Sequence, residues 1–472
     1  MATTGQLTRG VATPQQREGM SVRLAEYIAR VANAPLTEAD VEAVRRLMLD
    51  NFIISLWGER QPWTRELRDW AKRFAGTGTS PVLGADWTAD ASIAALIHGT
   101  ASHSYELDDA HDETLSHPGS VIIPSALAVG ATLGSSQMDL MRAVTVGYES
   151  MALVGCTASG MDTVHAGFHP TSTFGSLGAA AACASLRAYK DGEKVTADLI
   201  VRAWGHGLSQ ACGSMQFSAE SGGGAVKRVH AGYGARNGVE SAEFARLPAI
   251  TGPAQPIEGT YGLAAMFGGE LRHVEPASML QIHRISLKPY STCRLFHSTI
   301  DALDQLTDGF TMEPDRIERI TVRGHALIRN QHMQMRPTSP MAAQYSCPYI
   351  VGATLAYGPR RFAAYSGDYL NDRKILDIVE RVRFEESEEL SAYYPQRYAT
   401  GVEFQFRDGT SRSAVVIESR GTPDKPLSRE EILAKADGLA EQGQGAPGRH
   451  FADLLWDPEQ GALRIAQVFS KL

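Results

Sequence analysis

Three long stretches of this chain consist almost wholly of small, apolar residues, and they limit the possible folds more than any other feature. They read DASIAALIHGTASHSYEL, PGSVIIPSALAVGATLG and STFGSLGAAAACASLRAYK. Their apolar residues are too dense for a surface helix, which needs only one apolar stripe. We therefore predict helices that are buried on most sides, with alanine and glycine allowing them to approach closely. Because 472 residues are too many for one ordinary core, we also expect two domains.

The sequence pattern changes near Ala277. Before this point it is mostly helical, and a capping box from Thr37 to Asp40 opens one of the helices. After it, RIERITVRGHALI alternates as a strand does, and GVEFQFRDGTSRSAVVIES predicts a hairpin with Asp408 and Gly409 in its turn. Helical pattern then returns at LSREEILAKADGLA, which opens with a further capping box.

These patterns predict a mainly α protein with a large all-helical domain and a smaller α+β lid domain. The chain would begin with a flexible arm and end with a segment that returns to the helical domain. In residue numbers, the expected parts are the arm (1–20), the helical domain (21–276), the α+β lid (277–415) and the C-terminal segment (416–472).

Composition and charge argue against several classes of protein. The chain carries 45 Lys and Arg against 53 Asp and Glu, a net charge of −8, and has no long basic run, so we expect no nucleic-acid partner. It has no uninterrupted apolar run of about 18 residues, so we expect no membrane span. The polar N-terminus lacks the apolar core of a signal peptide, and the five cysteines are scattered without CxxC spacing. These features favour a cytoplasmic protein with reduced thiols.

The segment HSYELDDAHDETLSHPGS, from His103 to Ser120, places five carboxylates and three histidines before a predicted buried helix. Helix capping explains one or two of these groups, because acidic side chains favour a helix N-terminus. A metal site is a second interpretation, although the spacing fits neither an EF-hand nor HExxH. The third is acid/base chemistry, in which burial and mutual repulsion tune the pKa values of Asp108, Asp109 and His117.

A second His-Pro pair, in GFHPTSTFGSLGAAAA, repeats this architecture. His169 and Pro170, like His117 and Pro118, precede small hydroxyl residues and an apolar helix. A lone histidine near a helix start is more often structural than catalytic. Two of them, however, could lie at the mouths of two buried helices. Such a pair suits proton transfer, because an imidazole changes its charge near neutral pH.

Two basic segments and one tyrosine complete the set of candidates. SAESGGGAVKRVHAGYGARNG offers Lys227 and His230 after three glycines, either in a surface turn or in a mobile loop that binds an anion; it lacks the GxxxxGK[ST] pattern of a phosphate loop. ISLKPYSTCRLFHSTIDAL carries Lys288 and Arg294, which either hold carboxylates or form an ordinary surface patch. Tyr345, in AQYSCPYIVGATL, would by itself indicate only a core tyrosine.

Taken together and in this order, the five segments resemble the MmgE/PrpD family, over roughly residues 20 to 460. The resemblance implies a large helical domain and a smaller α+β lid, usually in a homodimer, with the active site between them and neither cofactor nor metal. The chain departs from the pattern at Glu106, where many relatives have Asp, and at Ala110, where they have Thr. By similarity, the active-site positions fall on Asp108, Asp109, His117, His169, Lys227, Lys288 and Tyr345.

The resemblance also indicates the chemistry, because the family includes 2-methylcitrate dehydratase, cis-aconitate decarboxylase and iminodisuccinate epimerase. Their small di- and tricarboxylate substrates must form a carbanion-like centre beside a carboxylate. Lys227, Lys288 and Arg294 would hold carboxylates, with His230 as a further binding candidate, while histidines move protons. We predict a cofactor-independent, 2-methylcitrate dehydratase-like lyase, because two histidines supply an acid and a base. An epimerase, a decarboxylase, a metal-dependent hydrolase and a carboxylate-binding protein are the alternatives.

Overall fold

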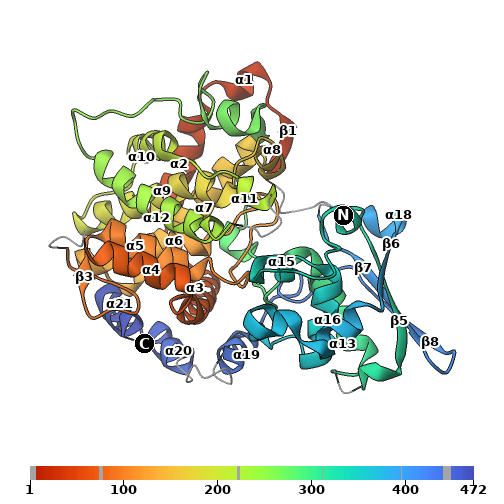
Figure 1. Ribbon diagram of the computed structural model, residues 1–472. Helices are drawn as coiled ribbons and strands as arrows, with labels where there is room; N and C mark the ends of the chain where they lie inside the picture. Colours follow the sequence, from red (N-terminus) through yellow and green to blue (C-terminus); the bar gives the residue numbers. More distant parts are fainter. Residues whose placement is uncertain are drawn as a thin grey trace.

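The computed structural model, which describes residues 7–73, 78–219, 224–310, 312–394, 396–439 and 448–471, consists of a helical body and a smaller α+β part (Figure 1). In Figure 1 the body lies on the left and the α+β part on the right. The predicted fold class is therefore confirmed. The helices of the body are α2 (Met20–Asn33), α3 (Glu38–Gly58), α4 (Pro62–Lys72), α5 (Ala91–Ser102), α6 (Gly119–Leu133), α7 (Gln137–Ala158), α8 (Gly160–His165), α9 (Pro170–Lys190), α10 (Ala197–Gln210), α11 (Gln216–Ala219) and α12 (Val226–Phe244).

The two apolar segments that follow the His-Pro pairs form α6 and α9. All residues of α6 except Thr132 are buried, and α9 is buried up to its last turn. Helix α9 packs against α7 and α12. Small residues permit this contact: a Cβ added at Gly238 of α12 would lie 2.2 Å from the Cβ of Ala179 in α9. The prediction of closely packed, buried helices is confirmed, and a larger side chain at either position would force the helices apart.

A four-stranded sheet with the order β6-β5-β7-β8 forms the β portion of the α+β part. β5 (Ile317–Gly324) pairs parallel with β6 (Val382–Glu386) and antiparallel with β7 (Thr400–Phe406), which forms a hairpin with β8 (Ser411–Val416). The predicted hairpin turn is confirmed, since Gly409 has a φ of +86° and Asp408 accepts a hydrogen bond from the backbone of Thr410. The helices here are α13 (His297–Leu306), α14 (Leu327–Gln331), α15 (Pro340–Gln344), α16 (Cys347–Tyr357), α17 (Arg373–Val379) and α18 (Glu388–Ser391), with 3₁₀ turns η3 (Arg294–Phe296), η4 (Pro314–Arg316), η5 (Phe362–Tyr365) and η6 (Gly367–Asn371).

The buried apolar residues form two clusters, one in each part. The first runs from Leu7 to Leu287 and takes in Phe362 and the C-terminal helices, and the second runs from Tyr290 to Val416. Helices α19 (Arg429–Leu439) and α20 (Gly448–Trp456) pack on α3, and α21 (Ala462–Ser470) packs on α6 (Figure 1). Within the described ranges, no helix has both the length and the apolar character needed to cross a membrane.

The N-terminal segment differs from the expected flexible arm. Residues Thr8–Val11 form β1, which pairs antiparallel with β4 (Arg272–Val274), and α1 (Pro14–Arg17) follows. The backbone N–H groups of Leu7 and Thr8 donate to the Glu113 carboxylate, and Leu7 is fully buried. For residues 7–19 the prediction is therefore wrong, because partners far along the chain hold a stretch whose own sequence is polar. Residues 1–6 lie outside the described part. Four short elements complete the body: β2 (Ser80–Pro81) and β3 (Thr88–Ala89), which pair with each other, and the turns η1 (Ala264–Gly268) and η2 (Gln281–His283).

A buried ion pair attaches the C-terminal helix α19 to the body. Lys435 Nζ lies 2.5 Å from Asp50 Oδ1 of α3, and both side chains are 1% exposed. Lys435 Nζ also donates to the carbonyl oxygen of Leu107, at 3.3 Å. Because Leu107 belongs to the acidic segment, this pair connects α19 to the loop that carries the candidate site residues.

Replacing Lys435 by methionine should lower the free energy of unfolding by about 3–5 kcal/mol, because Asp50 would remain as a buried carboxylate without its partner. The double variant Asp50→Asn with Lys435→Met should lose less than Lys435→Met alone, since neither charge then remains. Urea unfolding of the parent, both single variants and the double variant measures these losses. If the loss in the double variant equals the sum of the single losses, the two side chains do not act as a pair.

Candidate active site

A cavity of about 1170 Å³ lies between the helical body and the α+β part. The body contributes His117, His169 and Lys227 to its wall, and the α+β part contributes Arg294 and Tyr345. The structure thus brings together five of the residues that were singled out in the sequence. The remaining four lie outside the wall and are buried: Asp108, Asp109, His230 and Lys288.

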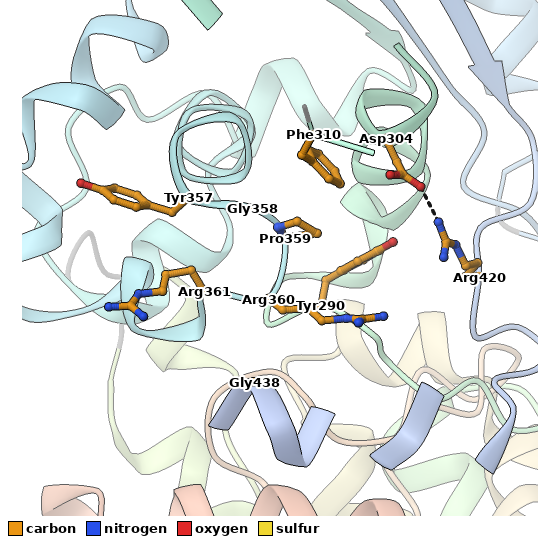
Figure 2. A pocket seen from close by; sticks show the side chains of 10 residues that line it. All are labelled: Tyr290, Asp304, Phe310, Tyr357, Gly358, Pro359, Arg360, Arg361, Arg420 and Gly438. Carbon is orange, nitrogen blue, oxygen red and sulfur yellow. Dashed lines mark hydrogen bonds and ion pairs between the residues drawn. The ribbon is translucent and has the colours of Figure 1, made fainter. Parts of the chain in front are cut away.

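A second cavity, of about 500 Å³, lies between the α+β part and α19 (Figure 2). Its basic side chains do not converge on one point: Arg420 pairs with Asp304 at 2.5 Å, whereas Arg361 points to the opposite side (Figure 2). None of the predicted site residues lines this cavity. The larger cavity is therefore the candidate active site.

The two His-Pro pairs lie where two neighbouring buried helices begin, as the sequence predicted. Pro118 directly precedes α6, and His169 is the N-terminal cap residue of α9. The backbone N–H of His117 donates to the hydroxyl of Thr171 in the first turn of α9, at 3.2 Å. This hydrogen bond holds the two helix starts, and hence both imidazoles, at one wall of the cavity.

His117 has a defined tautomer. Its Nδ1 lies 2.6 Å from the carbonyl oxygen of Asp109, which can only accept, so Nδ1 carries the proton. In the neutral ring Nε2 is then the basic atom, and the side chain keeps 15% exposure at the cavity wall. Burial lowers the pKa of His117 to about 3, and the nearby Lys288 acts in the same direction, while Asp108 opposes them. Without a bound anion, His117 is thus a neutral base at pH 7.

Behind His117 lies a buried His-Asp pair that the sequence-based candidates included only in part. His103 Nδ1 donates to Asp108 Oδ2 at 2.6 Å, and Asp108 also accepts from the Ser120 hydroxyl. The His103 ring centroid lies 5.2 Å from that of His117 and 5.5 Å from that of His169. His103 Nε2 is buried with no hydrogen-bond partner among the described residues. His103 therefore belongs to the imidazole group of the site, although it was not among the predicted site residues.

His169 and His230 form the other end of this imidazole group. Their Nδ1 atoms lie 3.2 Å apart, so one of them donates to the other. Burial, together with nearby His103 and Lys227, lowers the pKa of both rings, that of His230 to about 4. His230 thus acts on the cavity through His169, and the structure does not place it where it could hold a substrate directly.

Glu106 lies at the centre of the charged groups, although it was not among the predicted site residues. Its Oε1 accepts from Lys227 and, at 2.6 Å, from Arg228. Its Oε2 lies 3.2 Å from the Tyr345 hydroxyl and 3.5 Å from Lys288 Nζ. Burial alone would raise the pKa of Glu106, but Lys227, Lys288 and Arg228 hold it well below its usual range.

The charges in this cluster do not cancel. Lys227, Arg228 and Lys288 supply three positive charges, and Glu106 and Asp108 supply two negative ones, so one positive charge remains. Neutral histidines add none at pH 7. The cluster is therefore suited to an anionic ligand. Of its cations, only Lys227 reaches the cavity wall, and its Nζ donates to the Tyr345 hydroxyl at 3.0 Å.

The backbone that carries Glu106 is strained. Tyr105 and Glu106 have φ values of +69° and +54°, in the left-handed region that non-glycine residues rarely adopt. The α+β part holds this turn, because Gln344 and Ser291 both donate to the carbonyl oxygen of Tyr105, at 2.8 Å and 2.6 Å. The position of Glu106 thus depends on contacts between both parts of the molecule.

Helix capping, the alternative explanation of the acidic segment, applies to Asp109. Its Oδ1 accepts from the N–H of Gly119 at the start of α6, and its Oδ2 accepts from the Tyr148 hydroxyl. Burial raises the pKa of Asp109 to about 7. Two further acidic residues also hold structure, since Glu113 binds the N-terminal strand and Asp112 accepts from Ser286. Of the acidic groups in this segment, Glu106 and Asp108 therefore belong to the site, whereas Asp109, Asp112 and Glu113 stabilise the surrounding fold.

The remaining predicted features have mixed outcomes. Arg294 lines the cavity, but Ser419 accepts from it at 2.7 Å, and Asp112 and Glu418 lie 3.7 Å and 3.9 Å away. The glycine-rich loop lies partly outside the described residues, at 220–223, and Lys227 belongs to α12. Across the described residues, no group of three or more His, Cys, Asp or Glu side chains is arranged to hold a metal ion.

Two family models match the chain. The MmgE/PrpD N-terminal domain matches residues 22–273, and the MmgE/PrpD C-terminal domain matches residues 290–453. The chain belongs to the MmgE/PrpD family. This membership confirms the resemblance that the five sequence segments indicated.

Curated members of the MmgE/PrpD family match the chain over most of its length. A cis-aconitate decarboxylase of Aspergillus terreus is 27% identical and covers 92% of both chains. The cis-aconitate decarboxylase of Homo sapiens is 24% identical, over 93% of this chain and 89% of its own, and that of Mus musculus is 23% identical, over 85% and 82%. The prediction of a lyase is confirmed at the level of enzyme class.

Proposed function

We propose that this protein is a carboxy-lyase that removes CO₂ from a small di- or tricarboxylate of the cis-aconitate type, without a cofactor. The observation that carries the proposal is one cavity wall that combines Lys227 with the neutral His117 and His169. The activity of the similar proteins supports the proposal, since they are named cis-aconitate decarboxylases.

The chemistry follows from these groups. When the carbon–carbon bond to the leaving carboxylate breaks, its electron pair moves into the adjoining unsaturated carboxylate, and one proton must then form a new C–H bond. Lys227 and the Tyr345 hydroxyl would stabilise the negative charge in that conjugated system. Tyr345 stays protonated, because burial and then Glu106 raise its pKa well above the usual value.

The proton donor in this scheme is a histidine that becomes charged only in the complex. Free His117 has a pKa of about 3, mainly because of burial, and so carries no extra proton at pH 7. Substrate carboxylates bound at the same wall would raise that pKa, because a nearby negative charge favours the imidazolium. Binding of the substrate would thus charge His117 or His169, which then delivers the proton to the carbanion-like carbon.

A dehydratase, our interpretation from the sequence alone, is the second candidate. The orientation of His117 favours it, since the ring presents a basic Nε2 to the cavity and His169 lines the same wall. One imidazole would take the α-proton and the other, once protonated, would protonate the departing hydroxyl. A specificity for 2-methylcitrate remains a proposal that rests on the family resemblance.

Incubating the protein in D₂O with cis-aconitate, citrate, 2-methylcitrate and iminodisuccinate, followed by NMR, separates these functions. We expect CO₂ loss from cis-aconitate, with one deuteron incorporated in each product molecule. Water loss from one of the citrates would instead identify a dehydratase, and exchange with inversion would identify an epimerase. Saturable binding of an acid without exchange or turnover would leave only a carboxylate-binding protein.

Two further properties that the family resemblance implies can be tested, the first with the same assay. Activity should survive exhaustive dialysis against EDTA, and its loss on chelation with recovery on adding one metal would contradict cofactor independence. A homodimer is expected, and sedimentation equilibrium would detect it.

A further inference from the structure

The candidate cavity is much larger than a small tricarboxylate requires. Its volume of about 1170 Å³ exceeds the ~300–1,000 Å³ typical of pockets that hold drug-sized ligands. Only four of its lining residues are assigned to the reaction, namely His117, His169, Lys227 and Tyr345. The rest of the wall must therefore meet something other than the reacting carboxylates.

Apolar side chains of the helical body begin directly beside the imidazoles. The Phe217 ring lies edge-on to His169, with the ring centroids 5.7 Å apart. Met161 and Val164, on α8, and Met215 also line the cavity, and all three side chains are only half-buried. Methionine side chains are flexible and adapt to apolar groups of different shape. This side of the cavity thus offers an adaptable apolar surface next to the reacting atoms.

The α+β part supplies further apolar side chains to the cavity wall. Leu295, Leu327 and Met341 line the cavity, and so do two tyrosine rings. Tyr394 stacks on His325 at 4.2 Å, and Tyr398 lies below the guanidinium of Arg294 at 5.5 Å. These contacts hold the rings in place, so that the apolar surface is formed before any ligand binds.

A further substrate carboxylate would be disfavoured on this side. Arg294 is the cation there, and Asp112 and Glu418 already lie within 4 Å of its guanidinium. His332 does not add charge at pH 7, because burial lowers its pKa to about 4. Apart from the reaction groups, the described lining of the cavity thus offers many apolar side chains and one arginine that already has acidic partners, so it suits an uncharged, apolar group.

We propose that the preferred substrate carries an apolar substituent of several carbon atoms on its di- or tricarboxylate head. The head lies at His117, His169 and Lys227, and the substituent lies between Met161 and Leu327. This inference rests on the proposed function and adds the substrate class. Each buried methylene should raise kcat/KM about fourfold, the equivalent of ~0.8 kcal/mol.

A series of acids tests the proposal: cis-aconitate and its derivatives with a methyl, butyl or hexyl group on the methylene carbon. We expect kcat/KM to rise along the series, with the hexyl acid at least tenfold above cis-aconitate. A fall in kcat/KM from the methyl acid onward, with cis-aconitate itself decarboxylated, would overturn the substituent site and leave the proposed function intact. If no acid of the series loses CO₂, the carboxy-lyase proposal itself fails, and the substituent site fails with it.

The second test places larger side chains at the apolar positions of α8 that line the cavity. Met161→Trp should lower the ratio of kcat/KM for the hexyl acid to that for cis-aconitate at least tenfold. Val164→Phe, on the same helix, gives an independent variant if Met161→Trp does not fold. Met138→Trp is the matched control, because Met138 is 47% exposed on α7 and does not line the cavity, so its ratio should equal that of the parent. Unchanged ratios in both cavity variants would overturn the proposal.

Discussion

His117→Asn should lower kcat by about 10²–10⁴-fold with little change in substrate binding, as expected when a general acid or base is removed. His117 Nδ1 donates to the carbonyl oxygen of Asp109 at 2.6 Å. The asparagine amide can keep this hydrogen bond. The variant therefore loses chiefly Nε2, the basic ring nitrogen at the cavity wall. Steady-state kinetics on the acid identified by NMR, with thermal melts of the same samples, measures the effect.

His98→Asn is the matched control for this experiment. His98 is also a buried histidine whose pKa burial lowers to about 3, and its Nε2 lies 3.0 Å from Asn51 Oδ1. It does not line the candidate cavity. Its variant should melt at a lower temperature but keep the parent kcat in the folded fraction. Folded His117→Asn that turns over at the parent rate would remove His117 from the mechanism.

The pH dependence of the reaction gives a second check on His117. Because burial and nearby lysines hold its pKa at about 3 in the free protein, the ring is neutral above that value and becomes charged as the pH falls through it. The kcat/KM profile should therefore show no acid limb from His117 near pH 6.5, its ordinary value. In kcat, which reports the complex, an alkaline limb is expected instead, because substrate carboxylates raise the pKa of His117 and the rate falls when the imidazolium that donates the proton is deprotonated.

Much of the fold could be predicted because its signals are local. The density of small apolar residues in α6 and α9 and the alternation around Ile320 in β5 depend only on neighbouring positions. The N-terminal strand could not be predicted, since its pairing with β4 and its hydrogen bonds to Glu113 join residues more than 100 positions apart. No pattern in the neighbouring sequence indicates such a distant partner.

The site could be predicted only in part, because the sequence shows local composition but not which distant residues meet in the fold. The composition of the acidic segment indicated a reactive cluster but not which side chains face the cavity. Asp108 and Asp109 are adjacent, yet Asp108 contacts His103 while Asp109 caps α6. The left-handed turn at Tyr105 and Glu106, which brings Glu106 to the lysines, is held by residues of the α+β part. The family resemblance singled out Glu106 as a departure from the expected pattern, but it did not indicate the central position of Glu106 in the site.

Glu106→Gln should lower the free energy of unfolding by about 3–5 kcal/mol, because it leaves Lys227, Arg228 and Lys288 buried without their shared carboxylate. It should also lower kcat/KM by about 10²–10³-fold, the size of effect seen when a charge-stabilising group is displaced. Glu106 acts here as a positioning residue, since it holds Lys227 and the Tyr345 hydroxyl together at the cavity wall. Urea unfolding and steady-state kinetics on the same preparations measure both losses.

The conservative variant Glu106→Asp and a pH profile distinguish this role from a purely structural one. Glu106→Asp keeps the charge and shortens the side chain by one methylene, so it should recover most of the lost stability and part of the activity. Burial lowers the pKa of Lys227, and Glu106 is the main group that opposes this shift. Without that charge the pKa of Lys227 must fall further, and the alkaline limb of kcat/KM should move to lower pH in Glu106→Gln but not in Glu106→Asp. An unmoved alkaline limb in a folded Glu106→Gln protein would mean that Glu106 stabilises the fold without setting the charge of Lys227.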